Sequence, residues 1–125
     1  MSNKDFLNNT LESFLECAKS KKIILFGAGD EMHNAFSLFL DCNQLKPAYV
    51  VDNDFRKWYS RVLGYMIREP DVLRDEIPDG SVVLITSIYP YRIKEQIERL
   101  GIVHYYSSLL FVEQRLGRQQ FMIGF

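Results

Sequence analysis

A short apolar run leads directly into a glycine turn and then into a helical pattern near the start of this chain. Residues 23–26 are all apolar, and Gly27, Ala28 and Gly29 follow before an amphipathic segment. Glycine permits backbone angles that side chains forbid, and a chain without Cβ atoms lets a phosphate reach the amides of a helix N-terminus. The run therefore predicts a strand, a tight turn and a helix start, the first unit of a nucleotide-binding sheet.

The composition indicates one globular domain spanning residues 1–125, since 47% of the residues are hydrophobic and 14% are aromatic. The 15 Lys and Arg residues nearly balance the 16 Asp and Glu residues, giving a formal charge of -1. Such a chain has no global field that would hold it on nucleic acid or an anionic membrane, so we expect small-molecule or protein partners. The sequence also lacks a signal-like apolar core and a bilayer-length run, which predicts a cytoplasmic protein.

Apolar residues recur at helical spacing before the glycine turn, at Leu7, Leu11, Phe14, Leu15 and Ala18. This pattern predicts a leading helix within residues 1–20, with Ser2 or Asn3 as its N-cap.

Strand and helix patterns then alternate along the chain. A second helix is expected on an apolar face of Met32, Ala35, Phe36, Phe39 and Leu40. Further strands are expected at residues 48–51, 65–67, 82–85 and 104–106, with helices beginning at Pro70 and Pro90 and Gly101 ending the last one. The alternation predicts a three-layer α/β sandwich over residues 22–106, with a parallel five-stranded sheet in the order 3-2-1-4-5.

In such a sheet the ligand lies beyond the carboxyl ends of the strands where the strand order reverses, here between the first strand and the fourth. The expected site residues come from three loops, and we expect a pocket that is polar but lightly charged. They are Gly27, Ala28, Gly29 and Asp30 on one lip, Thr86, Ser87 and Ile88 on the opposite lip, and Asp52 and Asn53 after the second strand.

Asp52 stands close to the position where dinucleotide-binding proteins place an acid that accepts hydrogen bonds from ribose hydroxyls. The alternative is that Asp52 and Asn53 make a turn through hydrogen bonds from side chain to backbone. Arg56 follows shortly after and is expected to face solvent.

The glycine motif is incomplete, because Met32 occupies the position where a third small residue would allow tight packing of helix and strand. A methionine there is expected to push the helix outward or to fill the volume that a pyrophosphate would use. Asp30 and Glu31 favour the helix dipole but repel a phosphate.

No catalytic or metal site is expected. His33 on the first turn of the second helix is the one candidate base near the ligand, and Tyr89 and Tyr91 follow the fourth strand. No tyrosine precedes a lysine by four residues, and Ser87 has no visible partner base. The cysteines are isolated from each other, without the spacing of a zinc or redox site.

Several motifs occur in an order that resembles a known bacterial family. They are residues 24–29, 51–54, 57–58, 64–65, 69–70 with 73, 83–87, 96–97 and 100–102. The order is similar to the small Rossmann-like module found beside or fused to glycosyltransferases and sugar methyltransferases of surface-polysaccharide clusters. It also resembles the nucleotide-sugar-binding N-terminal domain of bacterial sugar acetyltransferases. The resemblance covers residues 22–106 and implies that Gly27, Ala28, Gly29 and Asp52 face the ligand.

The C-terminal extension, residues 107–125, is more apolar than a finished sheet requires, at residues 109–112 and 121–125. These residues are expected to pack against the leading helix, to extend the sheet or to meet a second subunit. We favour a homodimer, with intramolecular packing as the alternative.

The sequence thus favours a module that binds a nucleotide-type ligand, NAD or a UDP-sugar, and serves a partner glycosyltransferase or methyltransferase without chemistry of its own. One alternative is a small NAD-dependent oxidoreductase or epimerase-like enzyme in which Tyr89, Tyr91 or His33 moves the proton. A second alternative is an interaction scaffold with an empty cleft.

Overall fold

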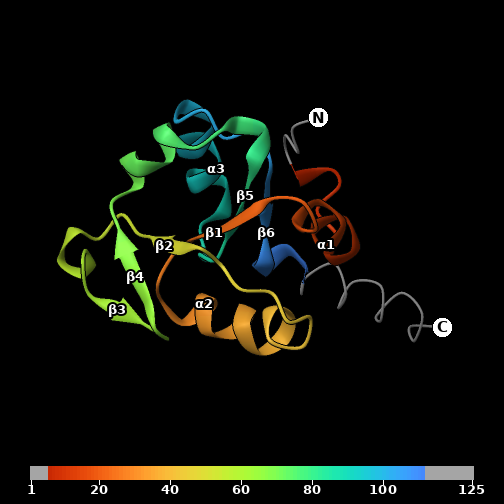
Figure 1. Cartoon of the computed structure of the whole chain (residues 1–125), viewed down its shortest axis with the longest axis horizontal. Helices are drawn as coiled ribbons and strands as arrows, with labels where there is room; N and C mark the ends of the chain where they lie inside the picture. Colours follow the sequence, from red (N-terminus) through yellow and green to blue (C-terminus); the bar gives the residue numbers. More distant parts are fainter. Residues whose placement is uncertain (1–5, 112–125) are drawn as a thin grey trace.

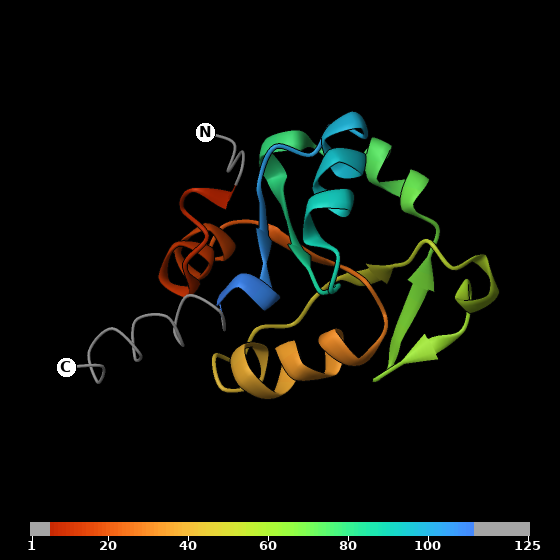
Figure 2. The ribbon, with the colours of Figure 1, turned by 180° about the vertical axis from the view of Figure 1, so that it is seen from behind.

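Six strands form a single sheet in the computed structural model, which describes residues 6–111. The spatial order of the strands is β3-β4-β2-β1-β5-β6. Their bounds are β1 (Lys22–Phe26), β2 (Tyr49–Val51), β3 (Arg61–Val62), β4 (Tyr65–Arg68), β5 (Ser81–Ile85) and β6 (Tyr105–Ser107). Helices α1 and α2 lie on one side of this sheet and α3 lies on the other, as two opposite views show (Figure 1, Figure 2). The chain therefore has the predicted three-layer, Rossmann-like α/β fold.

The parallel part of the sheet follows the predicted order 3-2-1-4-5, because β4, β2, β1, β5 and β6 are neighbours in that sequence and all run parallel. The sixth strand, β3, was not predicted; it pairs antiparallel with β4 at the sheet edge. Leu63 and Gly64 connect the two strands with φ angles of 50° and 85°. Two successive positive φ angles match the twist of a tight hairpin, so this edge strand depends on an unusual conformation of Leu63.

The central strands are buried on both faces, as expected for inner strands of a parallel sheet. In β1, Ile23 and Leu25 belong to one core cluster while Ile24 and Phe26 belong to the other. All five residues of β5 are buried. The apolar runs of the sequence therefore correspond to strands that separate two hydrophobic layers.

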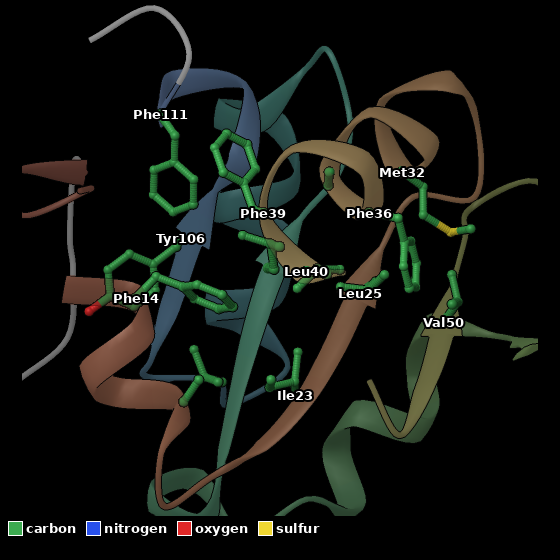
Figure 3. Close-up of a cluster of buried hydrophobic side chains, with 14 of the residues drawn as sticks. Phe14, Ile23, Leu25, Met32, Phe36, Phe39, Leu40, Val50, Tyr106 and Phe111 are labelled. Carbon is green, nitrogen blue, oxygen red and sulfur yellow. The ribbon is translucent and has the colours of Figure 1, made fainter. Parts of the chain in front are cut away.

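The first layer contains α1 (Leu11–Ala18), α2 (Asp30–Ala35) and the π-helical continuation η2 (Phe36–Leu40). Met32 is fully buried there, and Figure 3 shows it beside Phe36 and Val50. The methionine thus fills the space between α2 and the sheet. Of the two expected effects of Met32, filling of the ligand's volume is not seen, because its side chain points into this core layer; an outward shift of α2 stays a prediction.

The second layer lies on the opposite face of the sheet. It contains α3 (Pro90–Arg99) and the 3-10 helix η4 (Pro70–Asp75), which contribute Ile93, Ile97 and Leu73 to the core. Two further 3-10 turns, η3 (Phe55–Lys57) and η5 (Pro78–Gly80), connect the strands. The predicted helix starts at Pro70 and Pro90 are confirmed. Among residues 6–111, no helix has the length and apolar character needed to cross a membrane.

The leading helix begins later than its apolar spacing suggested. Thr10 is the N-cap, because its side chain accepts a hydrogen bond of 3.1 Å from the Ser13 amide. Leu7, which the helical pattern included, lies outside the helix and is 84% exposed. Ser2 and Asn3, the predicted caps, lie outside the described residues, and a helix that starts at Leu11 does not use them.

Asn9 leaves the helical pattern because its side chain completes the edge of the sheet. Its Nδ2 atom donates to the Ser107 carbonyl at 3.0 Å, and the Ser107 amide donates to Asn9 Oδ1 at 2.7 Å. The side-chain amide thus pairs with β6 as a neighbouring strand would. Asn9 and Ser107 are both fully buried, so water cannot replace the Asn9 side chain as the partner of the Ser107 N–H and C=O.

One part of the apolar C-terminal extension packs within the molecule. The Phe111 ring lies 6.0 Å from the Phe14 ring and 5.4 Å from the Phe39 ring, measured between centroids. Residues 112–125 lie outside the described part of the chain. The homodimer that these residues suggested stays a prediction.

We expect Asn9→Ala to destabilise the protein by about 2–4 kcal/mol, because it leaves the buried N–H and C=O of Ser107 unpaired. Chemical denaturation followed by circular dichroism measures this change. Asn34→Ala, on the exposed surface of α2, is the matched control and should change stability by less than about 0.5 kcal/mol. Equal stability of the two variants would contradict the role given to Asn9.

Candidate functional site

The glycine turn is held between two strands by hydrogen bonds. The Gly27 amide donates to the Val51 carbonyl at 2.8 Å, and Thr86 Oγ1 donates to the Gly27 carbonyl at 2.7 Å. Gly27 has a φ of 124°, and a Cβ atom on it would lie 2.4 Å from the Thr86 carbonyl oxygen. Glycine is therefore required at position 27 both by the backbone angle and by the close approach of β5.

Gly29 occupies a different environment. It is the N-cap of α2, with a φ of -106° that any residue adopts. A Cβ atom built on it would meet no other atom within 4 Å. The packing of the protein does not require glycine here, so the missing side chain leaves open space beside the start of the helix.

Asp52 uses both carboxylate oxygens within the protein. Oδ2 accepts a hydrogen bond of 2.8 Å from the Ala28 amide, and Oδ1 accepts one of 2.7 Å from the Asp54 amide. Of the two alternatives for this residue, the structure shows the turn. The Ala28 amide, in the glycine turn, thus already has a carboxylate partner. A ribose contact of Asp52 stays a prediction.

Two adjoining hollows open at the carboxyl ends of β1, β2 and β5. The α2-side hollow has a volume of about 300 Å³ and the α3-side hollow has one of about 260 Å³. Four residues line both, namely Gly27, Asp52, Ser87 and Tyr89. The α2-side hollow is also lined by Ala28, Gly29, Asp30, Glu31 and Lys57, with Thr86 and Ile88 opposite. The α3-side hollow adds Phe26, Asn53, Arg92, Ile93 and Gln96.

The predicted site residues are thus brought together at one edge of the sheet. They are Gly27, Ala28, Gly29, Asp30, Asp52, Asn53, Thr86 and Ser87. Their position at the reversal of strand order agrees with the topology. That they bind a ligand stays a prediction.

The fold and the sequence place this chain among known proteins. A family model described as C2185-like, N-terminal, matches residues 19–106. The chain belongs to this family. None of the curated proteins gives a significant match.

Solved structures with a similar fold have low sequence identity to this chain. RSP, a Rex-family repressor, is 16% identical with a TM-score of 0.52, over 94% of this chain and 68% of that chain. RSP in complex with beta-NAD+ and operator DNA is 14% identical with a TM-score of 0.52, over 88% of this chain and 63% of that chain. UDP-D-quinovosamine 4-dehydrogenase from Vibrio fischeri is 25% identical with a TM-score of 0.49, over 66% of this chain and 74% of that chain. The likeness to RSP shows the fold alone.

The charge of the cleft differs from the sequence prediction. Three carboxyl groups line the α2-side hollow, those of Asp30, Glu31 and Asp52, with Lys57 as their counterpart. Glu31 is only 8% exposed and accepts a hydrogen bond of 2.5 Å from Ser108 Oγ. The expectation of a lightly charged pocket is therefore wrong for this side, because Glu31 turns inward toward Ser108.

The candidate proton-transfer residues are dispersed. His33 is exposed, with Nδ1 at 3.1 Å from the Gly29 carbonyl, and it lines neither hollow. Tyr91 packs edge to face on Phe6 at 5.3 Å between ring centroids and also lies outside both hollows. Tyr89 lines both hollows. Among residues 6–111, no group of three or more His, Cys, Asp or Glu side chains is arranged to hold a metal ion.

Sequence reasoning missed Arg92 and Gln96, which line the α3-side hollow. Gln96 exchanges two hydrogen bonds with Asn53, at 2.9 Å and 2.8 Å, and this pair connects the loop after β2 with α3. The sequence did contain a signal for these two residues, because they stand one turn apart on the helix that follows β5, the fourth strand of the predicted sheet. The first turns of both helices beside the reversal point face the cleft.

Arg56 binds a neighbouring acid and does not line either hollow. Its Nε atom donates to Asp54 Oδ1 at 2.9 Å and its Nη2 atom donates to Oδ2 at 3.0 Å. These hydrogen bonds from the guanidinium lower the pKa of the Asp54 carboxyl. Arg56 is 78% exposed, in agreement with the expectation that it faces solvent.

The two glycines of the turn should respond differently to the same substitution. Gly27→Ala should destabilise the protein by about 3 kcal/mol, because the Cβ atom requires a strained backbone and overlaps the Thr86 carbonyl. Gly29→Ala should change stability by less than about 0.5 kcal/mol. Denaturation curves of the two variants measure the difference, and similar losses of stability would contradict the geometry of the turn.

Proposed function

We propose that this protein binds a nucleotide-type small molecule, NAD or a UDP-sugar, in the cleft formed by the two hollows. The observation that carries the proposal is the pair of glycines at the reversal of strand order. Gly27 permits the close approach of the chain to Thr86 after β5, while Gly29 leaves open space beside the start of α2. An open glycine turn at this point of a Rossmann-like sheet is where nucleotides bind in such folds. RSP, which shares the fold, has been solved with beta-NAD+, and this makes NAD one ligand to test.

We further propose that the protein binds its ligand without chemistry of its own. His33 and Tyr91, two of the three candidate proton carriers, line neither hollow. Tyr89 does line the cleft, but its ring contacts the guanidinium of Arg92, at 5.9 Å from the ring centroid. This arrangement suits a binding surface better than a proton relay, since proton transfer needs an acid or base within hydrogen-bond reach of the substrate.

The biological setting of this proposal rests on the resemblance to modules of bacterial surface-polysaccharide clusters. In that setting the protein would act in the cytoplasm and present its ligand to a glycosyltransferase or sugar methyltransferase, as a monomer or homodimer. RSP has been solved in complex with operator DNA, and this DNA binding is a property of RSP. A net charge of -1 supports our expectation that this chain binds no nucleic acid.

A thermal-shift panel of NAD, NADP, UDP, UDP-sugars and S-adenosylmethionine tests the proposed function. A ligand at 100 times its Kd stabilises the native state by about 2.7 kcal/mol, which should raise the Tm by at least about 5 °C. We expect UDP-sugars or NAD to produce this shift. Turnover of NAD with a keto-sugar would instead establish the enzyme alternative, and no shift with any compound would leave the scaffold alternative.

The open space at Gly29 gives a second test of the same cleft. Gly29→Leu should place its side chain in the α2-side hollow and weaken binding of the stabilising nucleotide by about tenfold or more, equivalent to at least about 1.4 kcal/mol. Asn34→Leu adds a comparable side chain to the exposed surface of α2 and should leave the affinity unchanged. Calorimetric titration measures both affinities. Equal affinities would show that the ligand does not lie at the glycine turn.

A further inference from the structure

The two halves of the cleft differ in electrostatic character. The α2-side hollow has three carboxyl groups, from Asp30, Glu31 and Asp52, against the single amine of Lys57. Glu31 is nearly buried, where water screens its charge poorly. A phosphate placed at the glycine turn would therefore meet an excess of negative charge.

The α3-side hollow has the opposite character. Asp52 is its one carboxylate, and both Asp52 oxygens already accept hydrogen bonds from backbone amides. Arg92 contributes a guanidinium, and no carboxylate of residues 6–111 lies within ion-pair distance of it. The Arg92 Cζ atom lies over the Tyr89 ring, 5.9 Å from its centroid, and this cation–π contact leaves the guanidinium N–H groups available. Arg92 is thus a cation beside the cleft with unused donors.

The neighbouring polar groups add further donors. Ser87 Oγ accepts a hydrogen bond of 3.1 Å from the Tyr89 amide, and its own O–H remains to donate. The first turn of α3 also leaves amides without an intrahelical acceptor, at Tyr91 and Arg92. Acidic residues are absent from that turn, whereas the first turn of α2 contains Asp30 and Glu31. The helix dipole is therefore offset at α2 and retained at α3.

We infer that the phosphate groups of the nucleotide bind in the α3-side hollow, to the Arg92 guanidinium and the Ser87 hydroxyl. The hydroxyl-bearing sugar then lies at the glycine turn, where the carboxylate of Asp30 accepts its hydrogen bonds. This assignment rests on the proposed function and reverses the usual orientation, in which the pyrophosphate lies at the glycine turn. Arg92 is the residue that selects a phosphorylated ligand over a nucleoside.

Paired titrations test this orientation. UDP and ADP are compared with uridine and adenosine, and the fluorescence of Trp58 reports binding. Trp58 is the single tryptophan of the chain and donates from Nε1 to the Asp52 carbonyl at 2.7 Å, so it adjoins the cleft. Arg92→Gln should weaken UDP or ADP binding by about tenfold or more, as expected for loss of a charge-assisted hydrogen bond, and leave nucleoside binding unchanged.

Two further variants distinguish the alternatives. Lys57→Gln removes the same charge from the α2-side hollow and should change nucleotide affinity by less than about twofold, because the phosphate is remote from it. Asp30→Asn should weaken the binding of nucleotides and nucleosides alike by severalfold, because it removes the carboxylate that accepts the sugar's hydrogen bonds. If the phosphate lay at the glycine turn, Lys57→Gln would weaken binding and Asp30→Asn would strengthen it severalfold, while Arg92→Gln would have little effect. That pattern would overturn the inference.

The outcome for wild-type protein separates this inference from the proposed function. If UDP and ADP bind no more tightly than uridine and adenosine, the binding function stands and the phosphate assignment fails. If none of the four compounds binds and NAD and the UDP-sugars also give no thermal shift, both fail. Circular dichroism melts of each variant verify folding, which exposed residues such as Arg92 and Asp30 should not disturb. Arg92→Lys, which retains the charge, should keep part of the preference for phosphorylated ligands.

Discussion

The backbone contact between Gly27 and Thr86 determines where the cleft of this molecule opens. It joins the ends of β1 and β5, and a Cβ atom at position 27 would lie 2.4 Å from the Thr86 carbonyl oxygen. After this contact the chain leaves β1 toward one face of the sheet and leaves β5 toward the other, where α2 and α3 form opposite layers (Figure 1). The two helices diverge from a single point. The cleft is the space between their first turns.

Much of the fold could be predicted because its signals are local. The apolar runs of β1 and β5 have no polar alternation, and this alone indicates inner strands of a parallel sheet. The features that sequence reasoning missed depend on distant or strained residues. The hairpin of β3 requires a positive φ at Leu63, a conformation that leucine rarely adopts. The late start of α1 depends on Asn9, whose partner Ser107 is 98 residues away in sequence.

The candidate site, like the fold, could be predicted only in part. Its predicted residues converge because each follows a parallel strand, and parallel strands end at one edge of the sheet. The state of each side chain was not predictable, since it depends on contacts between loops. Asp52, after β2, binds the Ala28 amide after the neighbouring strand β1, and Glu31 turns inward because Ser108 follows β6 at the same edge. Ser87 was placed at the site because it follows the carboxyl end of β5. The same reasoning, extended by one turn into α3, would have identified Arg92.

A glycine turn specifies an edge of the sheet, but it does not specify which part of a ligand lies there. Two helix N-termini face the cleft of such a fold, and only one of them follows the glycines. In this chain the acids of the first turn of α2 offset its dipole, while α3 begins with a proline and no acid. Electrostatics therefore favours the second helix for an anion even though the sequence motif marks the first. The glycines thus mark where the cleft opens, and the first turns of the two helices set the charge around it.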